Sequence, residues 1–219
     1  NSREKVTNQT IGSDLVPLEY TSTWHLDYVR GHEIINNEIS FQYTDSPVIE
    51  KRYERVFSHM ITMTGLQVGS SAYPVFNLTE YNTRKLKSIS YGETQINFVY
   101  DYCRDDMYDN VGAVLDSINV YYKNNKVPLK TISFITDYSN ANFCPDNTEE
   151  YEKKRLFLKS LIINGYNEED DFKKYIFEYN NKNDLPSSNS KGIDFWGYPN
   201  GIDNNQTLCP SPPLPGIDY

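Results

Sequence analysis

The feature that most constrains the fold of this chain is a hairpin pattern that recurs along it. Its clearest copy covers 85–101, with a tight turn at 92–94. In the return half, Ile96, Phe98 and Tyr100 alternate with mostly polar neighbours. A period of two is the mark of a strand with one face toward a core. The segment therefore predicts an antiparallel hairpin.

Three further segments repeat this arrangement. Two of them cover 114–138 and 155–179, and a more divergent copy covers 24–43. The spacing between copies is irregular, which favours a meander that adds hairpins to a growing sheet, with insertions between them, over a propeller. The residues that alternate on one face in these copies are Ile118, Val120, Tyr122, Tyr175, Phe177, Tyr179, Ile39, Phe41 and Tyr43.

Composition supports the same fold class. The chain has 219 residues, of which 14% are aromatic, including 19 Tyr and 10 Phe, and such residues favour strands. We therefore expect an all-β protein, an antiparallel meander of about four hairpins with little helix. Because one face of this sheet is apolar and must be buried, we expect a two-layer sandwich or a strongly curved sheet. An open single layer would need a partner to cover it.

The pattern changes near residue 185. Before it, 146–154 predicts a short helix, and 50–59 is ambiguous between helix and strand. After it, Pro, Ser, Asn and Gly dominate, and a proline cluster at 210–215 cannot sustain ladder hydrogen bonds. We predict a hairpin-repeat β domain at 1–185, followed at 186–219 by an aromatic clasp and a Pro-rich linker.

Several segments follow one another in a distinctive order. They are Arg84 to Ile89, Ile96 to Asp101, Arg104-Asp105-Asp106, Leu115 to Ile118, Tyr175 to Tyr179, Leu185 to Ser188 and Asp194-Phe195-Trp196-Gly197-Tyr198-Pro199-Asn200-Gly201. In that order the segments resemble large secreted proteins of Bacteroidetes related to the Rhs and YD-repeat group, over residues 20–208. The resemblance implies an exported or surface-associated β module and brings no catalytic residue with it. This chain has too few hairpins to close a shell around a cargo, as repeats of the wider group can, and Pro199 stands where the group often has Tyr or Phe.

Charge and cysteine content exclude several classes of partner. A net charge of −9 without a basic stripe argues against a nucleic-acid surface, and no apolar run is long enough to span a bilayer. The polar start lacks a signal-peptide pattern, so we expect a mature piece of an exported or cell-surface protein. Cys103, Cys144 and Cys209 lack metal-ligand spacing and favour unpaired thiols, although a Cys103–Cys144 bridge stays open in an oxidising compartment.

No catalytic constellation is visible, so we predict neither catalytic residues nor a metal or cofactor. His25, His32 and His59 share no metal-ligand spacing, and no nucleophile elbow is present. The acidic pairs in 105–106 and 168–171 lack the spacing of a calcium loop and read as solvated turns. Glycosidase carboxylates are defined by distance, so a cryptic glycan hydrolase is the least favoured alternative.

Trp196 and Tyr198 are the candidate interaction residues. They lie in a Gly/Pro-rich segment that has no evident reason to be ordered unless the rings dock. We favour docking on the domain's own sheet as a clasp, over contact with the next domain or a ligand. The sequence thus predicts a non-catalytic structural or interaction module that binds neighbouring domains of a larger chain or another surface protein. The alternative is a carbohydrate-binding module that uses exposed aromatic rings.

Overall fold

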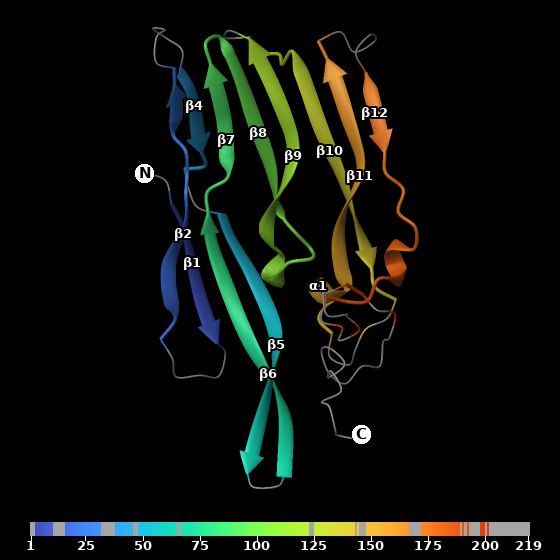
Figure 1. The fold of residues 1–219 in the computed structure, drawn as a ribbon. Coiled ribbons are helices and arrows are strands. Elements are labelled where there is room, and N and C mark those ends of the chain that lie inside the picture. The colour runs from blue at the N-terminus through green and yellow to red at the C-terminus, as the bar shows by residue number, and fades with distance from the viewer. Residues whose placement is uncertain are drawn as a thin grey trace.

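The computed structural model describes residues 3–10, 16–31, 38–45, 48–64, 67–122, 125–142, 144, 148–166, 172–188, 190, 192, 198–199 and 201. For 3–5, 8–10, 48–64 and 67–77 the structure describes the course of the strands and not the side chains. Within these residues the chain forms two antiparallel sheets with little helix (Figure 1). This confirms the all-β prediction.

The larger sheet consists of the four predicted hairpins, each added to the edge of the one before. The hairpins are β3–β4, β7–β8, β9–β10 and β11–β12, and in each the two strands pair antiparallel. In spatial order the strands are β3 (Tyr28–Arg30), β4 (Glu38–Tyr43), β7 (Leu86–Tyr91), β8 (Thr94–Cys103), β9 (Val111–Tyr122), β10 (Lys130–Asn140), β11 (Lys154–Gly165) and β12 (Lys173–Ile176).

The outermost strands are shorter than the pattern predicts. The first copy starts at Tyr28 and not at Trp24, because Trp24 ends a strand of the other sheet. The last strand ends at Ile176, although the Phe177 amide still donates to the Lys159 carbonyl at 3.0 Å. Both are edge strands, with a neighbour on one side only.

The smaller sheet has the order β2-β1-β6-β5. Its strands are β1 (Arg3–Thr10), β2 (Leu18–Trp24), β5 (Val48–Thr64) and β6 (Gln67–Thr83). The hairpin β5–β6 pairs along its full length, so the ambiguous segment 50–59 is strand. It is inserted in the chain between β4 and β7 and projects below the large sheet in Figure 1, with β5 beside β9.

A bulge recurs where one hairpin joins the next. On β7, β9 and β11 one residue is skipped in the pairing with the preceding strand, and that residue is Lys87, Asp116 or Lys159. Each follows a leucine and precedes a serine, so the sequence reads Leu-Lys-Ser or Leu-Asp-Ser. The skipped side chains are exposed, whereas the serines are buried. A repeated bulge adds twist at the same level of each hairpin.

A tyrosine fastens three of the four hairpins at this level. In each, its hydroxyl donates to the carbonyl of a leucine on the other strand or just before it, at 2.9 to 3.1 Å. In all three hairpins the tyrosine lies one residue beyond the position that the strand register places opposite the leucine. They are Tyr43 to Leu26, Tyr100 to Leu86 and Tyr179 to Leu158.

Short helices close the lower end of the large sheet. They are η1 (Tyr108–Asn110), α1 (Glu150–Lys153) and η2 (Lys182–Asp184). α1 begins with a capping box between Glu149 and Glu152. The helix predicted over 146–154 is thus present at 150–153, whereas 145–147 lie outside the described residues.

The two sheets do not enclose a common hydrophobic core in the part of the chain described. Among the residues whose side chains are described, only Val6 and Met107 are buried hydrophobic side chains. Figure 1 shows the strands of the large sheet side by side in one layer, and the small sheet meets it mainly where β5 contacts β9 and η1. The described residues therefore do not form the expected two-layer sandwich. The strands β1, β2, β5 and β6 lie largely below the lower end of the large sheet in Figure 1, and they leave its broad faces uncovered.

Candidate interaction surface

Strand register assigns the side chains of the large sheet to two faces, because residues directly opposite each other point the same way. Starting from Phe41, one row continues through Ile89, Ile96 and Val120. The neighbouring rows on this side are also apolar. We call the following residues the apolar face: Ile39, Phe41, Ile89, Tyr91, Ile96, Phe98, Ile118, Val120, Tyr122, Ile132, Phe134, Leu161, Ile163 and Tyr175.

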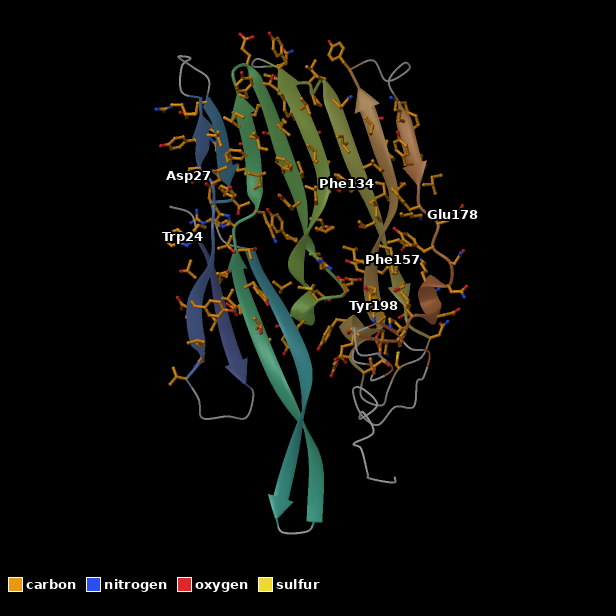
Figure 2. All side chains as sticks on the ribbon, viewed as in Figure 1. Trp24, Asp27, Phe134, Phe157, Glu178 and Tyr198 are labelled. Carbon is orange, nitrogen blue, oxygen red and sulfur yellow. The ribbon has the colours of Figure 1, made fainter. Side chains whose placement is uncertain are left out.

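The apolar face is open to solvent. None of its residues is fully buried, and Tyr91, Tyr122 and Tyr175 are 52%, 41% and 50% exposed. Figure 2 shows side chains along these strands, including Phe134, with no ribbon of a second layer over them. Core residues of a covered sheet would be almost completely shielded. Alternation alone marked Ile96 and Phe98 as core, and the structure shows that the described chain brings no second layer to them.

The opposite face carries a polar row at the middle of the sheet. Ser88, Asn97, Asn119, Thr131 and Asn164 stand opposite one another on five consecutive strands. The Thr131 hydroxyl donates to Asn119 Oδ1 at 2.9 Å. Hydroxyl and amide side chains that hydrogen-bond to one another and to water do not require a covering layer, so this face can remain exposed to solvent.

Ion pairs hold the loops at the lower end of the sheet. Arg104 forms a bidentate salt bridge with Asp106, in which Nε donates to Oδ1 at 3.0 Å and Nη2 donates to Oδ2 at 2.7 Å. Asp105 accepts from Lys154 Nζ at 2.8 Å and its amide donates to the Tyr138 hydroxyl at 3.2 Å. The hydrogen bond to Asp105 raises the pKa of Lys154. Both carboxylates of this acidic pair therefore serve loop structure.

The segment that follows η2 is fastened to the domain. Arg155, whose pKa burial lowers, donates from Nη2 to the Pro186 carbonyl at 2.9 Å. The Ser188 amide donates to the Glu152 carbonyl at 2.8 Å. Ser187 and Ser190 are buried. The start of the predicted clasp, 186–188, thus packs against α1 and β11.

The predicted ring residues of the clasp are only partly visible. Trp196 lies outside the described residues. Tyr198 lies below the large sheet in Figure 2, and it is 69% exposed. The docking of these two rings stays a prediction.

The described part of the chain brings no group of three or more His, Cys, Asp or Glu side chains together in a way that could hold a metal ion. His25 packs against Tyr43 with the two rings tilted by 42° and their centroids 4.6 Å apart. His32 and the acidic run 168–171 lie outside the described residues, and the side chain of His59 is not described. Cys103 and Cys144 are both free thiols, and Cys209 lies outside the described residues.

Comparison with known proteins leaves the surface to be interpreted from its own geometry. No protein family, curated protein or solved structure matches the chain. Among the described residues, no helix is both long and apolar enough to cross a membrane.

Proposed function

We propose that this chain is a non-catalytic structural and interaction module of an exported or cell-surface protein, and that its apolar face binds a neighbouring domain or another surface protein. The observation that carries the proposal is the partly exposed apolar face, which continues across seven strands of the described chain without a covering layer. The exported setting rests on the resemblance to the Rhs and YD-repeat group.

The size of the apolar face supports binding over chance exposure. Seven strands at about 4.8 Å spacing, with two or three alternating side chains each, cover roughly 500 to 700 Å². The largest apolar patch of a typical soluble monomer measures about 300 to 600 Å² and is often functional. In the paired rows of this face the charged residues are Lys130 and Lys173. The exposed bulge residues Lys87, Asp116 and Lys159 border the face at its lower end. The surface is thus large, apolar and nearly uncharged, as the centre of a protein interface is.

Two adjacent residues of β8 provide a direct test. Phe98 belongs to the apolar face, whereas Val99 points to the other side, where it is 41% exposed. A photoreactive phenylalanine derivative at position 98, in the full-length protein on its own cells, is expected to cross-link to a protein surface. The same derivative at position 99 is the matched control and is expected to give no such adduct. Equal labelling from both positions, or none from either, would contradict the proposal.

A carbohydrate-binding role is the second candidate, and one feature favours it. Tyr91, Thr94 and Tyr122 lie in one row at the upper end of the apolar face, and both tyrosine rings are exposed. A hydrogen bond with Glu93 raises the pKa of Tyr122, so a carboxylate stands beside the ring. Exposed rings beside polar groups can stack on sugars. Binding to a glycan array that is lost in both Tyr91→Ala and Tyr122→Ala, with no protein cross-link at position 98, would select this role.

A further inference from the structure

We infer that the partner of the apolar face is a second copy of this chain, bound face to face so that two large sheets form the sandwich that one copy does not make. The inference rests on the proposed function and names the partner of the same surface. Closed two-fold dimers are the most frequent oligomers, and they place one surface patch against itself.

The area is sufficient for a stable dimer. If each copy contributes roughly 500 to 700 Å² of projected face, the two together bury about 1,000 to 1,400 Å², at the lower end of stable interfaces. The side chains are also of the kind that packs between two sheets about 10 Å apart. They are aliphatic and aromatic residues that alternate with polar ones on the outer face.

The charges on the apolar face are placed so that a two-fold arrangement avoids repulsion. Lys130 and Lys173 belong to β10 and β12, on one half of the sheet. With the two-fold axis parallel to the strands and between β8 and β9, β12 of one copy lies over β3 of its partner and β10 lies over β7, so Lys130 and Lys173 do not meet their counterparts. Phe98 of β8 and Ile118 of β9 then lie near the axis, because β8 and β9 are the two middle strands.

Net charge gives this partner a distinctive salt dependence. Each copy carries −9, so two copies repel each other at long range, and salt screens that repulsion. Self-association through the apolar face is therefore expected to strengthen as salt is raised. A basic partner would show the opposite trend, since salt would screen its attraction.

The test is sedimentation equilibrium of the complete chain over a range of concentration and salt. The expected result is a species of twice the 25.5 kDa chain mass, whose dissociation constant falls as salt rises. Phe98→Lys is expected to weaken the dimer by about a hundredfold or more, as loss of a central anchor does. Val99→Lys, one residue along on the outer face, is expected to leave the dissociation constant within about threefold, since its side chain points away from the interface.

Circular dichroism decides whether Phe98→Lys still folds, and Phe98→Thr, which keeps a good strand former, takes its place if it does not. A native chain that stays a monomer at all concentrations overturns the inference. So does a dimer that Val99→Lys weakens as much as Phe98→Lys does, or a dimer whose dissociation constant increases as salt is raised. Failure of the inference is separable from failure of the proposed function. If the chain is a monomer but still cross-links from position 98 to a different protein, the second copy is overturned as the partner, whereas the proposed interaction module is supported.

Discussion

The hydroxyl of Tyr100 donates to the carbonyl oxygen of Leu86 at 3.1 Å, just beyond the point where the ladder between their strands ends. The last paired residues of that hairpin are Ser88 and Asn97. The side chain therefore supplies a hydrogen bond where the backbones have stopped pairing. Burial raises the pKa of Tyr100, so the hydroxyl keeps the proton that it donates.

We expect Tyr100→Phe to lower the free energy of unfolding by about 1 kcal/mol, because it removes one hydrogen bond and keeps the ring. Chemical denaturation of both proteins measures the difference. Tyr91→Phe is the matched control, since this ring lies on the same face of the same hairpin and is exposed, and it should change stability little. Equal losses in the two variants would show that the Tyr100 bond contributes nothing specific.

The third hairpin offers a gain in stability. The register of β9 and β10 places Thr136 where the other hairpins have the fastening tyrosine, opposite the equivalent Leu115. We expect Thr136→Tyr to be more stable than Thr136→Phe by about 1 kcal/mol, since the two differ only by the hydroxyl. Thermal and chemical unfolding of both variants check this. A tyrosine variant no more stable than the phenylalanine variant would argue against a shared fastening position.

These repeats show which parts of the fold the sequence could predict. The alternation of Ile96, Phe98 and Tyr100 and its counterparts marks all four hairpins, because a period of two is a local property of a strand. The long hairpin β5–β6 was missed, since its residues between 50 and 59 fit helix and strand alike and only pairing with distant β6 decides between them.

The candidate surface was harder to predict than the strands. Alternation identifies an apolar face but does not say what covers it, so Ile96 and Phe98 were expected in a core. Whether a second layer lies over a sheet depends on where distant strands pair. Here β1, β2, β5 and β6 pair with one another to form the smaller sheet. Trp196 and Tyr198 were singled out by composition alone, and the open single layer that needs a partner to cover it was the less favoured alternative to a sandwich.

An ion pair near the lower end of the sheet predicts a pH effect on stability. A hydrogen bond from Lys182 Nζ to Asp137, at 2.9 Å, and the amide of Tyr138 lower the pKa of Asp137. A carboxyl whose pKa is lower in the folded state stabilises the fold above its unfolded pKa of about 3.9, and this contribution is lost as pH falls through the folded pKa. Because Asp137 is about half exposed, we expect a contribution of well under about 1 kcal/mol.

The measurement is the free energy of unfolding of the native chain and of Asp137→Asn between pH 7 and pH 3. The native chain should be slightly more stable at pH 7, and the two curves should converge at the acid end. Added salt should narrow the gap, since the pair is exposed. Asp45→Asn is the control, because Asp45 is more exposed and its pair with Lys87 is longer, at 3.3 Å. Curves that stay parallel down to pH 3 would contradict this assignment.

The two described cysteines differ in their surroundings, and a thiol reagent should distinguish them. Cys103 is exposed at the end of β8, whereas Cys144 is partly buried and its Sγ lies 3.5 Å from the Ala141 carbonyl oxygen. In a Cys209→Ser background we expect two reactive thiols, of which the one at 103 reacts faster, because access to the sulfur limits the rate. Cys103→Ser should remove the fast phase and Cys144→Ser the slow one. A background variant with no titratable thiol until a reductant is added would mean that Cys103 and Cys144 are joined, and the loops that carry them would then have to approach each other.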